Sequence, residues 1–355
     1  MLRKAAALLL ACASVMGWMS CSTSSSSNQY LYAAIPGSNE IVVYRADPNS
    51  GVLTQLAGSP VTAGPAVESV LVHPSKKFLY AANSGEGDIS LFTISSSGGL
   101  SEVTPRTLAG TAPTLMVMDS AGTFLYVMNS GSFNVSVFSI DASSGTLTPV
   151  GAAFPIGISP INMKLSPSGN VLYIAGAGSP GVIEAFAMNQ GAPTVVNGTP
   201  FFTGTDPFGL AIDSTGSFLY TANKLDNSIS EFTINSDGSL TELSSSPIGE
   251  TYTGPDALLI DQSGKYLYVA NQGAGNLAAY SIGSDGGLTL LTTSPFATGS
   301  DPSFIATDPN GKYIFVGNAT NPSVQSFSLD TSDGALTSVQ TYSVPGNPTS
   351  IALTP

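Results

Sequence analysis

The sequence predicts an all-β protein, a seven-bladed β-propeller with four antiparallel strands in each blade. Three observations predict it: an aromatic phrase recurs seven times at nearly constant spacing, turn residues separate short strand-like runs, and no segment keeps a helical period. The 355 residues are 42% hydrophobic, and 38 Gly and 24 Pro are spread along the chain. That apolar content excludes disorder for most of the chain.

The repeated phrase reads Phe-Leu-Tyr-Ala-Ala-Asn in its second copy, residues 78–83. Its third residue is aromatic in every copy, and successive copies lie 46 to 48 residues apart. The seven aromatic residues are Tyr32, Tyr80, Tyr126, Tyr173, Tyr220, Tyr268 and Phe315. A repeat of about 40 to 50 residues that holds several short strands is typical of a propeller blade.

The second unit shows the four strands expected of each blade. Residues 69–72, 78–82, 89–94 and 100–104 are rich in β-branched, aromatic and aliphatic side chains, which favour strands. His73-Pro74-Ser75-Lys76 separates the first two runs, and a Ser-Ser-Gly-Gly segment separates the last two. Both segments have the composition of tight turns.

The two ends of the sequence predict how the ring closes. Residues 348–355 match the first strand of a unit, whereas residues 28–30 match the point where the second strand begins. We therefore expect the C-terminal strand to complete a blade whose other three strands come from residues 30–57. The chain would then enter the ring on the rim that holds the first turns, and the starts of the inner strands would lie on the opposite rim.

The first residues have the pattern of an export sequence. We predict a lipoprotein-type signal peptide over residues 1–21, a Ser-rich linker over 22–29 and a single propeller over 30–355. A basic start and an apolar run precede Cys21, the expected lipidation site, with Cys12 as the alternative processing site. This predicts a lipid-anchored protein of the cell envelope; the alternative is a soluble periplasmic or secreted protein.

Charge and composition exclude several classes of function. Without residues 1–21, eight Lys and Arg stand against 23 Asp and Glu, a net charge of −15. We expect no nucleic-acid partner and no membrane contact except through the lipid anchor. No cysteine follows Cys21, and His73 is the single histidine, in a turn position that other units give to Asp, Ser or Thr. Ser-His-Asp, Cys-His and histidine-based metal sites are therefore excluded.

Acidic residues gather where the inner strands begin. A proline opens this strand in six units, and oxygen-bearing side chains lie beside that position in five: Glu68, Asp206, Asp256, Asp301 and Asn347. Inner strands converge on the central channel, so these side chains form a candidate ligand site at its mouth. Asp206, Asp256 and Asp301 are candidate ligands for Ca²⁺ or Mg²⁺, which prefer oxygen. The alternative is that they only form turns and stay solvated.

Lys164 is a charged residue in an inner strand where the other units carry Leu, Val or Ala. It is a candidate to pair with an acid of the mouth or to hold an anionic ligand; the alternative is a packed stem with a solvated head. Asn recurs at the end of the second strand, either as a ring of amides for sugar binding or as a cap of the adjoining loop. Arg45, Arg106 and Lys224 are expected to be solvated surface residues.

The phrases Phe-Leu-Tyr-x-Ala-Asn, Leu-Thr-x-Leu and Asp-Pro-Asn-Gly-Lys-Tyr resemble those of the lactonase-type seven-bladed propellers. That family includes 6-phosphogluconolactonase-like and carboxymuconate-cyclase-like proteins and borders on the YVTN-repeat propellers. The resemblance covers residues 30–355 and implies the fold and, by analogy, lactone hydrolysis. Enzymatic members carry Asp-Leu-Gly-x-Asp-Arg after a second strand and a His after an inner-strand Pro. Here residues 83–88 read Asn-Ser-Gly-Glu-Gly-Asp, and no His follows such a proline.

Two functions follow from these observations. The first is a binding module that presents the rim opposite its tether to a protein, a glycan or a small-molecule ligand. The alternative is a lactone hydrolase whose site has diverged and uses a bound metal ion. No catalytic residue is assigned from the sequence.

Overall fold

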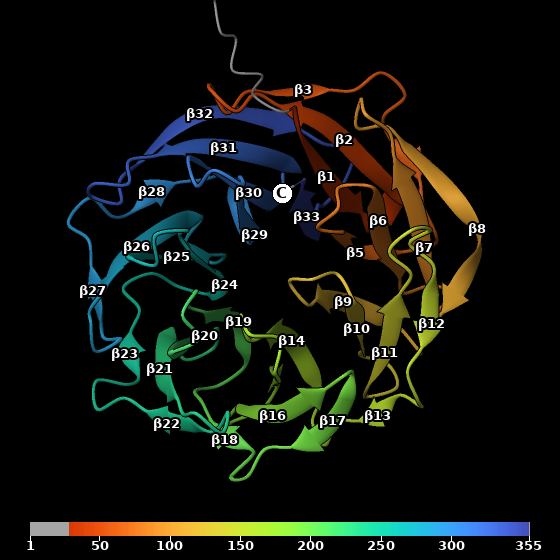
Figure 1. Cartoon of the computed structure of the whole chain (residues 1–355). Helices are drawn as coiled ribbons and strands as arrows, with labels where there is room; N and C mark the ends of the chain where they lie inside the picture. Colours follow the sequence, from red (N-terminus) through yellow and green to blue (C-terminus); the bar gives the residue numbers. More distant parts are fainter. Residues whose placement is uncertain (1–27, 355) are drawn as a thin grey trace, which may run out of the picture.

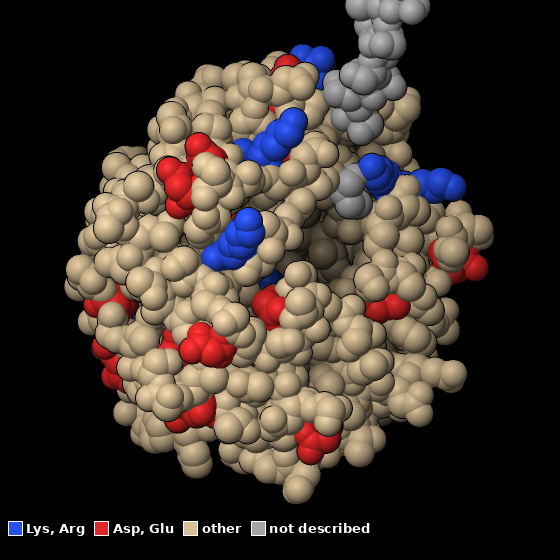
Figure 2. Space-filling view, turned by 60° about the vertical axis from the view of Figure 1, so that its left-hand side comes forward, with Lys and Arg blue, Asp and Glu red and all other residues tan. Residues whose placement is uncertain are grey.

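The computed structural model describes residues 28–354, which form seven sheets around a central channel (Figures 1 and 2). The predicted signal peptide, Cys21 and most of the linker lie outside the described residues. Within the described part, the one helical element is a short 3₁₀ turn, Pro36–Ser38, so no helix there has the length to cross a membrane. The predicted seven-bladed propeller is confirmed.

The strands of each blade follow one another from the channel outwards. Blade 1 holds β1 (Gln29–Ile35), β2 (Glu40–Ala46), β3 (Leu53–Gln55), β4 (Val61–Thr62) and the C-terminal β33 (Ser350–Leu353); blade 2 holds β5 (Val67–Val72), β6 (Phe78–Asn83), β7 (Asp88–Ile94) and β8 (Leu100–Leu108); blade 3 holds β9 (Pro113–Met118), β10 (Phe124–Asn129), β11 (Asn134–Ile140), β12 (Leu147–Pro149) and β13 (Phe154–Pro155); blade 4 holds β14 (Pro160–Leu165), β15 (Val171–Gly176), β16 (Val182–Asn189), β17 (Ala192–Val195) and β18 (Phe201–Phe202).

The remaining blades repeat this order. Blade 5 holds β19 (Pro207–Ile212), β20 (Phe218–Asn223), β21 (Ser228–Ile234), β22 (Leu240–Glu242) and β23 (Ile248–Gly249); blade 6 holds β24 (Pro255–Ile260), β25 (Tyr266–Asn271), β26 (Asn276–Ile282), β27 (Leu288–Leu290) and β28 (Phe296–Ala297); blade 7 holds β29 (Ser300–Thr307), β30 (Tyr313–Thr320), β31 (Ser323–Leu329) and β32 (Leu336–Ser343). Five blades have a short fifth strand because their outer strand is interrupted, whereas β8 and β32 run on without a break.

The repeated tyrosine joins five of the seven blades to the next blade. The buried hydroxyl of Tyr80 donates to the carbonyl of Gly145 at 2.7 Å, and that of Tyr220 donates to Gly286 at 2.7 Å. Tyr32, Tyr173 and Tyr268 make the same contact one blade further on. The carbonyl belongs in each case to a hairpin turn between the third and fourth strands, so the repeated phrase encodes contacts between blades as well as a strand.

The C-terminal strand closes the ring as the sequence predicts. β33 pairs antiparallel with β1, with Leu353 opposite Leu31, and the two lie side by side in Figure 1. The hydroxyl of Thr354 accepts a hydrogen bond from the backbone N–H of Tyr30 at 2.9 Å, and the N–H of Thr354 donates to the carbonyl of Tyr30 at 2.9 Å. Asp119 makes the same two kinds of contact with Phe124 inside a continuous blade. The chain ends therefore reproduce an ordinary first turn.

His73 has the structural role that its position predicts. Its Nδ1 accepts a hydrogen bond from the backbone N–H of Ser75 at 3.0 Å, and its Nε2 lies 3.0 Å from the carbonyl of Gly122 in the next blade. This network assigns the proton to Nε2. The imidazole is 4% exposed, far from the starts of the inner strands, and it joins blades 2 and 3.

Candidate functional site

A repeated irregularity of the inner strands builds the mouth of the channel. In six blades the pairing between the first and second strands skips one residue, directly after the inner-strand proline or, in blade 2, after Val67, which is a β-bulge. The skipped residues are Glu68, Thr114, Ile161, Phe208, Asp256 and Ser303. In blade 1 the equivalent residue is Thr349, directly before β33. Each blade thus supplies one side chain from a residue that is not paired with the second strand.

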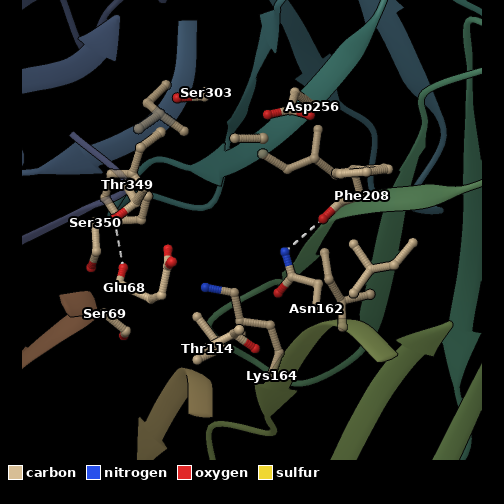
Figure 3. A pocket seen from close by; sticks show the side chains of 17 residues that line it. Glu68, Ser69, Thr114, Asn162, Lys164, Phe208, Asp256, Ser303, Thr349 and Ser350 are labelled. Carbon is tan, nitrogen blue, oxygen red and sulfur yellow. Dashed lines mark hydrogen bonds between the residues drawn. The ribbon is translucent and has the colours of Figure 1, made fainter. Parts of the chain in front are cut away.

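All seven of these residues line one cavity of about 260 Å³ on the ring axis (Figure 3). Leu115, Asn162, Leu210 and Phe304 add to its wall, and Lys164 reaches it from deeper in the channel. This is the rim opposite the point where the described chain begins, because β1 starts beside Thr354 and Glu68 lies at the other end of the inner strands. The cavity is therefore the candidate functional site.

Glu68 is positioned by both neighbouring chain segments. The hydroxyl of Thr349 donates to its backbone carbonyl at 2.8 Å, and the hydroxyl of Ser84 lies 3.4 Å from its carboxylate. Burial raises the pKa of Glu68, although the hydrogen bond from Ser84 opposes this shift. A carboxylate with a raised pKa is a better proton acceptor than an exposed one.

Asp256 and Lys224 form an ion pair at the same mouth. The Lys224 ammonium lies 2.7 Å from the Asp256 carboxylate and 4.2 Å above the centre of the Phe208 ring. Lys224 is 23% exposed, so the expectation that it is a solvated surface residue is wrong. It is held because it lies between a carboxylate and an aromatic face. Burial raises the pKa of Asp256, and Lys224 opposes this shift.

Lys164 projects into the channel from β14. Its side chain keeps accessible surface because the channel is open, yet the walls of the ring surround it. This enclosure lowers the pKa of Lys164 by desolvation. In Figure 3 its amine and the carboxyl of Glu68 point into the same cavity from two blades that are not neighbours.

Asp206, Asp301 and Asn347, the other predicted mouth residues, lie outside this cavity. Each of them precedes the inner-strand proline, whereas the cavity residues of the same blades follow it. Asp206 and Asp301 have left-handed φ angles of 52° and 56°, in the turn before β19 and within the first residues of β29. Asp206 accepts a hydrogen bond from the N–H of Gly178 at 3.1 Å, and Asp301 accepts one from the hydroxyl of Thr320. Asn347 is exposed before β33. These contacts match the turn-forming alternative.

The predicted cation ligands do not form a cluster. Within residues 28–354, no group of three His, Cys, Asp or Glu side chains is arranged to hold a metal ion. Asp256 is the one member of the predicted trio that lines the cavity, and its carboxylate is already bonded to Lys224. The residues present do not fit a Ca²⁺ or Mg²⁺ site, so we derive no step through a metal.

The recurring asparagines are buried and hold loops in place. Asn83, Asn129, Asn223, Asn271 and Asn318 are each 0% exposed. The amide of Asn83 donates to Asp88 and Ser90 of the next strand at 2.7 and 3.0 Å. It also packs on Gly64, where an added Cβ would lie 2.3 Å from the amide carbon. This geometry is that of a loop cap.

A family comparison matches the chain to the model described as "Lactonase, 7-bladed beta-propeller", over residues 64–159, 157–258 and 245–353. The chain belongs to this lactonase family. A search of curated proteins found no match. Among solved structures, a candidate 6-phosphogluconolactonase from Bacteroides fragilis has a TM-score of 0.80 at 22% identity, covering 93% of this chain and 99% of its own. The periplasmic gluconolactonase of Pseudomonas aeruginosa has a TM-score of 0.77 at 22% identity, covering 92% and 99%. At this identity the likeness shows the fold.

This lactonase-family chain departs from the expected motif at the bulged position. A histidine that follows an inner-strand proline would occupy one of the skipped positions or that of Thr349, and none of these positions holds a histidine here. Sequence reasoning missed Thr114, Ile161, Phe208, Ser303 and Thr349 as lining residues. The shared offset of one residue after the proline could have identified them.

Proposed function

We propose that this protein hydrolyses a small lactone at the channel mouth, with Glu68 and Lys164 as the catalytic residues. The observation that carries the proposal is that a carboxyl with a raised pKa and an amine with a lowered pKa line one cavity in a chain of the lactonase family. Burial moves the two pKa values towards each other, which suits an acid–base pair near neutral pH.

The reaction requires a base for water and a donor for the oxyanion. Glu68 accepts a proton from water as its oxygen attacks the lactone carbonyl, which gives a tetrahedral intermediate with a negatively charged oxygen. The Lys164 ammonium donates a hydrogen bond to that oxygen. The ring C–O bond then breaks, and the departing alkoxide takes the proton held by Glu68. The product is the hydroxy acid, and both side chains return to their starting states.

The charges of the cavity favour an uncharged lactone. Two carboxylates, Glu68 and Asp256, stand beside two amines, Lys164 and Lys224, and no arginine lines the cavity among the described residues. A phosphorylated lactone would gain most from bidentate arginines. Phe208 and Phe304 offer flat apolar surfaces to the C–H face of a ring.

The test is the hydrolysis of glucono-δ-lactone and its 6-phosphate, followed by acid release above the spontaneous rate. We expect Glu68→Gln to lower kcat by about 10²- to 10⁴-fold and to remove the loss of activity towards low pH. Lys164→Met tests the oxyanion donor. Asp301→Asn, outside the cavity, is the matched control. Equal activity of Glu68→Gln and the parent protein would refute the proposal, and so would inactivation by Asp301→Asn, because Asp301 lies outside the cavity.

A second candidate function is binding without turnover by the same cavity. The observation that favours it is the departure from the motif of enzymatic relatives: residues 83–88 lack the leading Asp and the Arg. A glycan, a small molecule or a protein segment would then occupy the rim opposite the tether. Saturable binding of gluconate or its lactone in calorimetry, without acid release, would distinguish this function from hydrolysis.

We also propose export and a lipid anchor at Cys21. The apolar run before Cys21 and the Ser-rich segment after it support this. The described chain begins on the rim opposite the cavity, so an anchored protein would present the cavity away from the membrane. Metabolic labelling with palmitate should mark the parent protein and Cys12→Ser but not Cys21→Ser. Equal labelling of Cys21→Ser would refute the assignment.

A further inference from the structure

We infer that Lys164 is a nucleophilic amine that captures a small aldehyde or ketone as an imine inside the channel. The inference goes beyond lactone hydrolysis and does not depend on it. It rests on three properties of the amine: apolar surroundings, the lack of a carboxylate partner, and access from the cavity.

The first property is the layer of the channel in which Lys164 lies. The equivalent positions of the other six inner strands all hold aliphatic side chains: Leu71, Val117, Ala211, Leu259, Ala306 and Ala352. Lys164 itself stands opposite Tyr173 in the ladder, so the backbone fixes where its side chain starts. The stem of Lys164 therefore starts among aliphatic groups, and its amine reaches the cavity that Glu68 also lines.

The second property is the absence of an ion pair. Among residues 28–354, the carboxylates within 4.0 Å of a cation are bound by Arg106 and Lys224, and none is bound by Lys164. The charged groups that share its cavity are Glu68 and Asp256, and the second of these is neutralised by Lys224. With enclosure and no close counter-ion, the pKa of Lys164 is lowered. A desolvated lysine with a lowered pKa is the usual source of an imine-forming amine.

The third property is access. The Lys164 side chain is exposed to the channel, and the cavity above it has room for a molecule of a few carbon atoms. The neutral amine attacks the carbonyl carbon, and the carbonyl oxygen takes a proton to give a carbinolamine. The hydroxyl leaves as water with a proton from the carboxyl of Glu68, which gives the protonated imine, and this returns its proton to the Glu68 carboxylate to leave the imine. One water is released, and no oxidant or reductant is needed.

The test is reductive trapping of the full-length protein with glycolaldehyde and cyanoborohydride at pH 7, followed by peptide mapping. Lys265, which is exposed on the opposite rim, is the internal reference. We expect Lys164 to be labelled faster than Lys265, because a lowered pKa raises the neutral, nucleophilic fraction of the amine. Lys224 should label slowly because its amine is bonded to Asp256.

Two variants make the test decisive. Lys164→Arg keeps a cation but cannot form an imine, so it should lose the fast label while Lys265 is unchanged. Glu68→Gln should slow the labelling of Lys164 alone. Labelling of Lys164 no faster than that of Lys265 in the folded parent protein would overturn the inference. Lactone hydrolysis measured on the same samples is a separate readout, since either activity can fail without the other.

Discussion

The closing strand offers the sharpest test of how the ring is held together. Ile351 in β33 is 4% exposed and packs with Ala33, Ile35 and Phe315. Ile351→Ala removes three buried carbon groups at about 0.8 kcal/mol each, and the cavity left behind brings the expected loss to about 2 to 5 kcal/mol. Unlike other inner strands, β33 has no covalent link to the strand beside it, since it pairs with β1 from the other end of the chain. The loss should therefore also open the ring locally.

Ile305→Ala is the matched control, because Ile305 has the same place in β29, and a turn joins β29 directly to β30. Both variants should lose similar free energy of unfolding in urea. Only Ile351→Ala should speed amide hydrogen exchange at Tyr30 and Tyr32, whose N–H groups face the closing strand, and make the C-terminus sensitive to carboxypeptidase. Equal exchange at these amides in both variants would refute the idea that the closing strand opens on its own.

Three further outcomes follow from the contacts between blades and from buried charges. Tyr80→Phe should cost about 1 to 2 kcal/mol in urea unfolding, because the carbonyl of Gly145 loses its buried donor; no change would show that water replaces the hydroxyl. Burial raises the pKa of Glu250 above its ordinary 4.5, so the folded state binds the extra proton and stability should fall as pH rises through that raised value. Glu250→Gln, which can still accept from Tyr280, should therefore be more stable than the parent at pH 8 and similar at pH 4; an equal pH dependence would contradict this. Lys224→Met should cost about 1 to 3 kcal/mol by leaving a buried carboxylate unpaired, measured by thermal unfolding, and an unchanged melting temperature would argue against the pair.

The fold was predictable because its repeat serves two purposes at once. The aromatic residue of each copy lies in the second strand, and in five copies it is a tyrosine that bonds to the next blade, so its spacing measures the blade directly. The match between Thr354 and the first-turn residues likewise predicted the closure. The repeated tyrosine and Thr354 each make a contact that recurs around the ring, so both contacts can be recognised from the repeat in the sequence.

The site was only partly predictable because one residue decides which way a side chain points. Asp206 and Asp256 both adjoin an inner-strand proline, the first before it and the second after it. The residue before adopts a left-handed turn and bonds to a neighbouring loop, whereas the residue after bulges towards the axis. The residue types alone place both side chains at the channel mouth. Their positions in the strand register decide which of the two reaches the cavity. The burial of Lys224 was equally hidden, because its partner comes from the next blade.

The skipped residue has a consequence for how this protein can change over evolutionary time. Because the bulge takes that residue out of the strand ladder, replacing its side chain leaves the strand pairing of the blade as it is. The six skipped positions and the equivalent Thr349 therefore supply side chains that can alter what the axis of the ring accepts, and of these a change at Asp256 also breaks its ion pair with Lys224. Ligand preference can diverge among descendants of one ancestor while the ring that carries it stays the same.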